Sequence, residues 1–315
     1  MAPRFTSAPP ARPPPTPPSN TGVCNPLLPS THPRSGRMTA WRWDWYAATV
    51  TDSAHELQAA LLALYPGSWA EVASALYGYS DAFTVRDGEG LRARVMHGGR
   101  NGWPNVSGSG QDAPATAQLL RERFPLHAVT RCDVAADFDG PDAWERLSGL
   151  GFAVADDHKA KVQHAGDWHR GIDGRTLYVG APTSGVRVRI YEKGKELRAK
   201  QVPGAEAIGE DVVRVEVQVR PEGRSRNVAA LMTPEAAWGF SRWSRDLVAR
   251  VDGTDVPRTT IKEPRKSDDD RALEFLVLQY GAVLERQAEK HGGWDRLAAV
   301  MRSKHERNLR RKDDR

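Results

Sequence analysis

The stretch VVRVEVQVR, residues 212–220, alternates valine with charged or amide side chains, and this alternation decides the kind of fold to expect. Successive side chains of a β-strand point to opposite faces of a sheet, so Val215, Val217 and Val219 share one face. The other face then carries Arg214, Glu216, Gln218 and Arg220. One apolar and one polar face is typical of antiparallel sheets that are covered on one side only.

Two further stretches have the same two-faced pattern. In VRVRIY, residues 186–191, the apolar positions are Val186, Val188 and Ile190, and the polar positions are Arg187, Arg189 and Tyr191. In CDVAADF, residues 132–138, Asp133 and Asp137 lie on the face opposite the apolar residues. We therefore expect the valines and the isoleucine of these strands to be buried beneath helices.

Apolar residues recur with helical or strand-like spacing along the rest of the chain. Helices are predicted over 53–66, 111–124, 141–151, 233–251 and 268–290, with Ser53 and Thr233 as N-caps and Gly67 as a stop. Strands are predicted at 43–50, 74–86, 91–97 and 175–180, and a glycine turn at 107–110. The expected fold class is α+β: a curved antiparallel sheet with helices on one face.

The proline content divides the chain into parts. Residues 1–37 contain 11 of the 22 prolines, and such a segment cannot bury a core. The expected organisation is a disordered proline-rich tail at 1–37, a catalytic domain at 38–251, a linker at 252–267, and C-terminal helices with a basic tail at 268–315. Met38 is an alternative start to Met1, and removal of residues 1–37 is expected to leave folding and catalysis intact.

Composition argues against several classes of protein. The 315 residues contain no apolar run of about 18 residues and no apolar signal core, so a cytoplasmic protein without a membrane span is expected. Cys24 and Cys132 are not expected to form a disulfide. Much of the net charge of +5 comes from the two ends, where residues 1–37 hold four arginines and no acid. A nucleic-acid surface on the folded part is therefore expected to be a local stripe.

The charged faces of the three strands have two interpretations. A solvated polar face is common in antiparallel sheets and requires no function. Two aspartates, a glutamate and a tyrosine among arginines also have a chemical use. Converging carboxylates repel one another unless they are protonated or bind a cation, and their oxygens suit Mg²⁺ or Mn²⁺. A divalent ion, arginines and a phenol are together sufficient for attack on a phosphodiester.

The segments SGSGQDA, VTRCDVAADF, TLYVGAPTSGVRVRIYEKGKEL, RVEVQVRP and LVLQYGAVLE follow one another between Trp45 and Tyr280. In these segments the sequence resembles the replication initiation factor family (Rep_trans) of rolling-circle plasmids, phages and integrative elements. The resemblance implies a nicking-closing enzyme whose fold is similar to a duplicated TATA-box-binding-protein-like sheet. One tyrosine of such an enzyme cuts a strand at an origin, stays joined to the 5′-phosphate and leaves a 3′-OH as primer.

The resemblance also implies roles for individual residues. Tyr191 matches the family tyrosine, and Arg189 and Lys193 are the neighbouring cations expected to assist it. Asp133 and Glu216 match acidic positions associated with a Mg²⁺ or Mn²⁺ site. Asp137 is either a further metal ligand or the partner of a basic side chain. Contacts to DNA are expected from Arg187, Arg214, Arg220, Arg224 and Arg226, and the rival nucleophiles are Tyr178 and Tyr280.

The expected partners are origin DNA with a single-stranded or hairpin nick site, a second copy in a homodimer, and the host helicase and polymerase. Two other functions fit the same residues. A relaxase would use the same chemistry to start conjugative transfer. A non-catalytic, sequence-specific DNA-binding regulator would need the basic face but not the tyrosine and its acids. Formation of a covalent adduct with DNA separates the regulator from the two enzymes.

Overall fold

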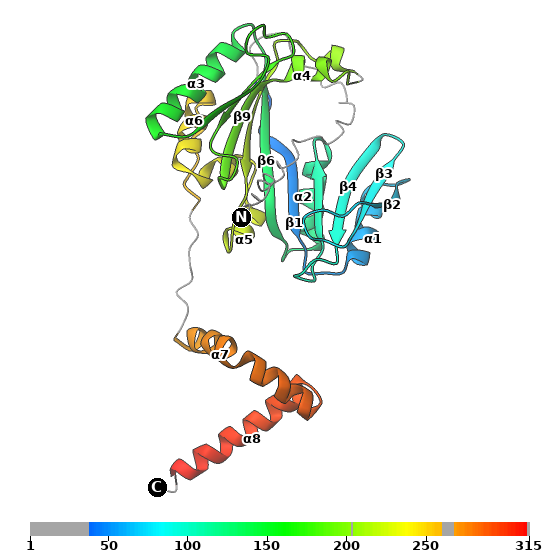
Figure 1. Cartoon of the computed structure of the whole chain (residues 1–315), viewed down its shortest axis with the longest axis vertical. Helices are drawn as coiled ribbons and strands as arrows, with labels where there is room; N and C mark the ends of the chain where they lie inside the picture. Colours follow the sequence, from blue (N-terminus) through cyan, green and yellow to red (C-terminus); the bar gives the residue numbers. More distant parts are fainter. Residues whose placement is uncertain (1–37, 203, 260–267, 314–315) are drawn as a thin grey trace, which may run out of the picture. The chain divides into compact units, whose positions relative to one another are not determined.

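The computed structural model describes residues 38–202, 204–259 and 268–313, so the predicted proline-rich tail lies outside the described residues. The chain divides into two compact units at Ile261 and Lys262. The first unit is built on one antiparallel sheet of ten strands in the order β2-β3-β4-β5-β1-β6-β10-β9-β8-β7 (Figure 1). The strands are β1 (Arg42–Thr49), β2 (Trp69–Ala73), β3 (Asp81–Asp87), β4 (Gly90–His97), β5 (Asn105–Ser109), β6 (Ala128–Phe138), β7 (Val162–Gly166), β8 (Arg175–Val179), β9 (Val186–Glu192) and β10 (Val213–Val219).

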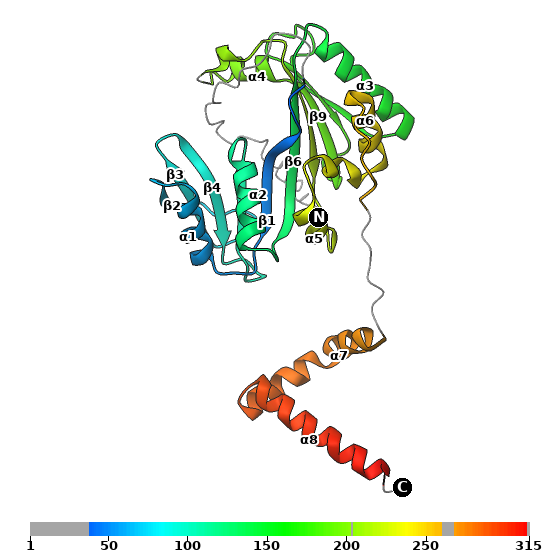
Figure 2. The same ribbon diagram turned by 180° about the vertical axis from the view of Figure 1, so that it is seen from behind.

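Helices cover one face of this sheet. Helix α2 contacts β1 and β5, α3 contacts β8, β9 and β10, and α5 contacts β6. Figures 1 and 2 show α3 and α6 packed together beside β9. The helices of this unit are α1 (Ala54–Leu64), α2 (Asp112–Arg123), α3 (Ala143–His158), α4 (Lys193–Ala199), η1 (Ala205–Ala207), α5 (Ser225–Leu231), η2 (Glu235–Phe240) and α6 (Arg242–Asp252). The expected α+β fold with a large antiparallel sheet is confirmed.

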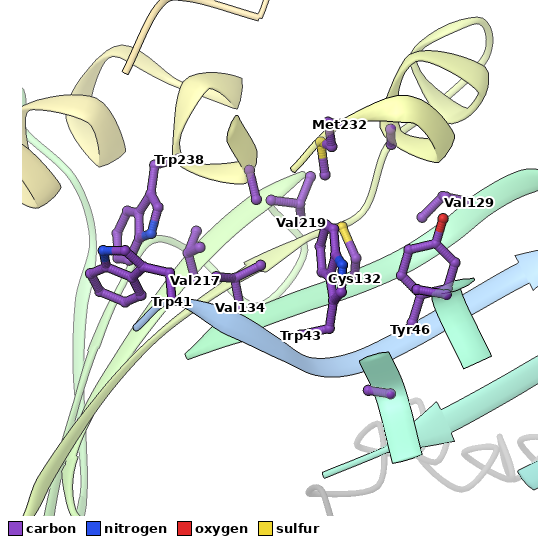
Figure 3. Close-up of a cluster of buried hydrophobic side chains, with 14 of the residues drawn as sticks. Trp41, Trp43, Tyr46, Val129, Cys132, Val134, Val217, Val219, Met232 and Trp238 are labelled. Atoms are coloured by element: carbon purple, nitrogen blue, oxygen red, sulfur yellow. The ribbon is translucent and has the colours of Figure 1, made fainter. Parts of the chain in front are cut away.

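The core lies between the sheet and its helices. All five predicted core residues of β9 and β10, from Val188 to Val219, are fully buried. In Figure 3, the indoles of Trp41 and Trp238 meet edge to face, with ring centroids 4.9 Å apart. Full burial of one valine or isoleucine side chain contributes about 1.5–3 kcal/mol to the stability of the folded state. The apolar face predicted from the alternation of valines therefore packs against the helices, and the charged side chains lie on the opposite face of the sheet.

Local signals placed some elements correctly and others wrongly. Ser53 caps α1 as predicted, because its hydroxyl accepts from the Glu56 amide and the Glu56 side chain accepts from the Ser53 amide. The single helix predicted at 233–251 is wrong. It is divided into η2 and α6, and the cap of α6 is Ser241, whose hydroxyl accepts from the Ser244 amide. Thr233 caps neither of them.

The glycine turn predicted at 107–110 is also mostly wrong, because Ser107, Gly108 and Ser109 belong to strand β5. Gly108 is required there by close packing, since a Cβ at this position would lie 2.2 Å from the Thr116 hydroxyl of α2. Only Gly110, with φ of +58°, turns the chain into the helix. Strands β2 and β7 were missed because they are short edge strands with exposed side chains, which leaves little alternation to detect.

The second unit consists of α7 (Asp268–His291) and α8 (Trp294–Asp313). Gly292 and Gly293 separate the two helices and have φ values of +80° and +125°. The short helix and basic tail predicted for this end are instead one helix of 20 residues. In the part of the chain that the structure describes, no helix combines the length and apolarity needed to cross a membrane.

Candidate active site

Pairing of β6, β10 and β9 aligns the predicted site residues in rows across the polar face. In the first row Arg214 pairs with Asp137 on one side and Tyr191 on the other. In the second row Glu216 pairs with Ala135 and Arg189. The third row contains Asp133, Gln218 and Arg187. Neighbouring rows are two residues, or about 6.6–6.8 Å, apart along each strand. The tyrosine, the acids and the arginines therefore converge on one region.

Tyr191, Arg189 and Glu216 form a hydrogen-bonded group, which we call the tyrosine cluster. One terminal nitrogen of Arg189, Nη2, donates to Glu216 Oε2 at 2.7 Å and to Tyr191 Oη at 3.2 Å. The guanidinium carbon of Arg189 lies 4.1 Å from the centre of the Tyr191 ring. Arg189 thus joins the predicted nucleophile to the predicted metal ligand.

Burial of Tyr191 corrects one sequence-based expectation. A place on the polar face was expected to keep this side chain out of the packed interior, yet only 2% of it is exposed. Burial raises the pKa of the Tyr191 phenol to about 12, because loss of hydration outweighs the attraction of Arg189 and Lys193. The isolated protein therefore holds a neutral phenol at this position. An approaching phosphate has to reorganise its surroundings before the oxygen can react.

Burial also dominates the electrostatics of Glu216, of which 3% is exposed. Loss of hydration raises the pKa of this carboxyl, and repulsion from Asp44 and Asp133 raises it further, against the opposing effect of Arg189. Asp44 and Asp133 therefore lie close enough to Glu216 to repel its carboxylate. Such crowding favours uptake of a proton or a cation.

Lys193, which was predicted to assist the tyrosine, is the first residue of helix α4. Its Nζ lies 5.5 Å from the centre of the Tyr191 ring and donates to Glu196 Oε2 at 2.9 Å. Only 7% of Lys193 is exposed. This residue therefore supplies a buried positive charge on the side of the ring that leads to α4.

A second ionic group surrounds Asp137, and we call it the aspartate cluster. Both oxygens of Asp137 accept from Arg214, at 2.6 and 2.9 Å, and Arg42 donates to Oδ2 at 2.7 Å. Arg214 also donates to Asp44 at 2.9 Å. These cations hold the pKa of Asp137 well below its usual range. In this structure Asp137 holds basic side chains, which is one of the two roles expected for it, and its role as a metal ligand stays a prediction.

Asp133 and Asp44 are the remaining acids of the polar face. Asp133 is fully buried and accepts from Arg131 through both oxygens and from Gln218. Asp44 was missed by sequence reasoning. In WRWDW, residues 41–45, tryptophans alternate with polar residues, and this pattern puts Asp44 on the face of the sheet opposite to that of Trp43. No three carboxylate, histidine or cysteine side chains form a ready metal-binding group among the described residues.

The predicted DNA-binding arginines separate into three kinds. Arg214 is 5% exposed and belongs to the aspartate cluster, where it donates to Asp137 and Asp44, and its contact with DNA stays a prediction. Arg187 and Arg220 lie half-buried on the polar face, and Arg224 and Arg226 lie exposed at the start of α5. Of the rival tyrosines, Tyr178 lies beneath Arg187, whose guanidinium carbon is 3.9 Å from its ring centre. Tyr280 lies in α7 of the second unit.

Comparison with known families accounts for this part of the chain. Residues 127–272, which include β6, β9, β10 and the tyrosine cluster, match the replication initiation factor family, Rep_trans. This segment is a replication initiation factor domain. The predicted family is thereby confirmed, and Tyr191, Asp133 and Glu216 all lie inside the domain. Asp44, which reaches the same face from β1, lies outside it in the sequence.

Among solved structures, the chain is similar to a rolling circle replication initiator protein from Geobacillus stearothermophilus. The two share 17% sequence identity, and the alignment covers 76% of this chain and 96% of that chain with a TM-score of 0.48. No match was found among curated proteins.

Proposed function

We propose that this protein initiates rolling-circle replication by nicking and rejoining one DNA strand at an origin, with Tyr191 as the nucleophile. The observation that carries the proposal is the tyrosine cluster inside the replication initiation factor domain. A phenol, a guanidinium and a crowded carboxylate on one sheet face can serve as nucleophile, phosphate clamp and charge partner. A sheet face used only for structure has no need of this combination.

The proposed reaction is a transesterification. Tyr191 loses its phenolic proton to water, and its oxygen attacks the scissile phosphorus. A bond forms between Tyr191 Oη and phosphorus, while the bond between phosphorus and the 3′-oxygen breaks. The 3′-oxygen takes up a proton and leaves as a 3′-OH, and the 5′-phosphate remains on the tyrosine. Attack by a 3′-OH on this phosphotyrosine reverses the step and rejoins the strand.

Arg189 is placed to stabilise this reaction. Its Nη2 already touches the attacking oxygen, so a phosphate bound to the same guanidinium would lie next to the nucleophile. Negative charge that develops on the phosphate oxygens would be neutralised by Arg189 and Lys193. These cations also favour the phenolate, which opposes the effect of burial on the pKa of Tyr191. Binding of the DNA phosphate thus supplies the reorganisation that the buried phenol requires.

The acids near the tyrosine fit a divalent cation by their chemistry. Asp133, Glu216 and Asp44 present hard oxygen atoms, and the mutual repulsion that raises the pKa of Glu216 would be relieved by a positive ion. In this proposal Asp133 and Glu216 hold Mg²⁺ or Mn²⁺, while Asp137 and Asp44 remain bound to Arg214. Such an ion, when bound, polarises the scissile phosphate as a Lewis acid.

A covalent trapping experiment tests the proposal. A labelled hairpin oligonucleotide from the origin of the same replicon is incubated with the protein and Mg²⁺ or Mn²⁺, and the adduct is separated under denaturing conditions. We expect an adduct with the wild type and with Tyr178→Phe, but none with Tyr191→Phe, which keeps the ring and loses only the oxygen. Peptide mapping should locate the 5′-phosphotyrosine at residue 191.

Two outcomes would overturn the proposal. An adduct that persists in Tyr191→Phe moves the nucleophile to another residue. Sequence-specific binding of the hairpin without any adduct, under either metal ion, makes the protein a non-catalytic regulator. An adduct on a transfer origin in preference to a replication origin would identify a relaxase with the same chemistry.

A further inference from the structure

Three arginines that belong to neither cluster crowd together on the polar face. Arg131 of β6, Arg187 of β9 and Arg220, which directly follows β10, are half-buried. We call them the arginine row. Val219 pairs with Cys132 on one side and with Val186 on the other. Arg220 therefore lies beside Arg131, two residues beyond Gln218, the partner of Arg187. Among the residues that the structure describes, Arg131 is the one of these three that forms an ion pair, with Asp133.

The positive charges of the arginine row repel one another. Burial lowers the pKa of Arg187, and the positive charges of Arg220 and Arg189 lower it further. Burial likewise lowers the pKa of Arg220, with Arg131 adding repulsion. Arginine side chains that are partly desolvated beside other arginines cost free energy unless an anion neutralises them. The fold therefore keeps more positive charge here than its own acids balance.

Hydrogen-bond donors in the row also remain available. A guanidinium has five N–H donors in a planar fork. Arg187 uses one terminal nitrogen to donate to Gln163 at 2.7 Å, and its buried Nε has no hydrogen-bond partner within the described part of the chain. Within the described residues, the Arg220 side chain makes one hydrogen bond, from Nη1 to the Pro182 carbonyl at 2.8 Å. Free donors on a crowded set of cations are suited to phosphate oxygens.

Aromatic rings hold two of these guanidinium groups in place. The Arg187 carbon lies 3.9 Å from the centre of the Tyr178 ring, and the Arg131 carbon lies 4.8 Å from the centre of the Trp45 ring. Stacking of this kind fixes the plane of the fork before a ligand arrives. The row is therefore preorganised and not a set of free surface side chains.

The arginine row begins on β9, the strand that carries Tyr191 and Arg189, and continues across the neighbouring β10 to β6. Tyr191, Arg189 and Arg187 project from the same face of β9 at intervals of two residues, which is about 6.6–6.8 Å per interval. Arg220 and Arg131 follow one interval later. An extended strand of DNA whose scissile phosphate meets Arg189 can therefore place a neighbouring phosphate on Arg187 and the next on Arg220 and Arg131.

We propose that Arg131, Arg187 and Arg220 form a phosphate-binding subsite for the single strand that flanks the scissile phosphate, so that the DNA runs along β9 away from Tyr191. The proposal rests on the proposed function only in taking Tyr191 as the site of cleavage. The subsite contacts the backbone and selects an extended single strand, because a single row of cations follows one backbone.

The first test measures binding and requires no cleavage. The Tyr191→Phe protein is titrated with a fluorescent single-stranded oligothymidylate at several salt concentrations. Adding Arg187→Ala or Arg220→Ala should weaken binding about tenfold and reduce the slope of log K against log salt by about 0.7, the value for one phosphate of a single strand. Arg123→Ala, an exposed arginine at the end of α2, is the matched control and should change neither quantity.

The second test first changes the DNA and leaves the three arginines intact, so its first result does not depend on the folding of an arginine variant. Neutral methylphosphonates replace single phosphates, one at a time, on each side of the mapped nick in the hairpin. We expect two adjacent positions on one side only to weaken binding to Tyr191→Phe about tenfold. The loss at the position facing Arg187 should disappear when Arg187→Ala is also present.

Equal affinity and equal salt slope for Arg187→Ala, Arg220→Ala and Arg123→Ala would overturn the subsite. So would methylphosphonate effects spread evenly over both sides of the nick. Failure of the wild type to form an adduct would instead overturn the proposed function, while the oligothymidylate result would stand. The two proposals can therefore fail separately.

Discussion

The tyrosine cluster and the aspartate cluster adjoin on the same sheet face, where Tyr191 pairs with Arg214 and Glu216 lies two residues beyond Arg214, yet their electrostatics are opposite. In the aspartate cluster, both oxygens of Asp137 are held by Arg214, and Arg42 adds a further hydrogen bond. Its pKa lies well below the usual range. In the tyrosine cluster, one nitrogen of Arg189 serves both Glu216 and Tyr191, and the pKa of each of these acids is raised.

The difference shows how one sheet face can combine structure with chemistry. A carboxylate that is saturated by guanidinium groups gains stability and loses the ability to bind anything else. An acid that shares a single cation, beside other acids, retains unsatisfied charge and can accept a cation or a proton. Arg189 also keeps a buried Nε without a partner. We therefore regard the aspartate cluster as structural and the tyrosine cluster as the place where substrate completes the electrostatics.

Replacement of one acid in each cluster should separate the two roles most strongly. Glu216→Gln keeps the shape of the side chain but removes its charge, so adduct formation should fall by about 10²–10³-fold, the range seen for loss of one key electrostatic group. Affinity for the hairpin should stay within about threefold. The same adduct assay on Asp137→Asn, corrected for the folded fraction, should remain within tenfold of the wild type. Equal losses in both variants would remove the distinction.

Metal removal sharpens the same assay. If Asp133 and Glu216 hold a divalent ion, EDTA should abolish adduct formation by the wild type, and added Mn²⁺ or Mg²⁺ should restore it. Binding of the hairpin by Tyr191→Phe should be measured in parallel, with and without EDTA. Unchanged cleavage in EDTA would show that the carboxylates serve another purpose.

The stability of the fold should respond in the opposite order. Asp137→Asn leaves Arg214 buried with much of its charge uncompensated, and breaking a buried ion pair in this way costs about 3–5 kcal/mol. Chemical denaturation at pH 7 measures the change. Glu216→Gln should cost less, because the carboxylate that it removes is itself crowded by other acids. A larger loss for Glu216→Gln would reverse our assignment of the two clusters.

Acid should reduce the difference between wild type and Asp137→Asn. The pKa of Asp137 is lowered in the folded protein, so its stabilisation is fully present above the unfolded-state value of about 3.9 and declines as the pH falls below it. Unfolding free energies of the two proteins should therefore converge between about pH 4 and pH 2. A difference that stays constant over this range would mean that the charge of Asp137 contributes little.

The smallest effect is expected at the rim of the aspartate cluster. The Arg42 side chain is 36% exposed, in contrast to 6% for Arg214. Exposed ion pairs contribute between zero and about 1 kcal/mol, so Arg42→Ala should lower the free energy of unfolding by no more than that amount. Its contribution should shrink further in 0.5 M salt. A loss as large as that of Asp137→Asn would place the centre of the cluster at Arg42.

Much of the fold was predictable because its signals are local. The alternation at 212–220 and 186–191 identified two strands inside the sheet and their buried faces, and Ser53 identified the start of α1. The edge strands β2 and β7 have exposed side chains on both faces and so carry no such signal. Ser241 was overlooked as a cap because Ser and Thr recur through the region, and only the backbone conformation selects among them.

The sequence by itself determined which side chains share the polar face, because the period of a strand is two and does not depend on its neighbours. It did not determine which acid pairs with which arginine. That choice depends on strand order and register, which bring Asp44 to Arg214, leave Glu216 with Arg189, and bury Tyr191. Long-range pairing and desolvation arise only when the chain is folded. Tertiary structure alone therefore decided that Asp137 is saturated and that the tyrosine cluster is not.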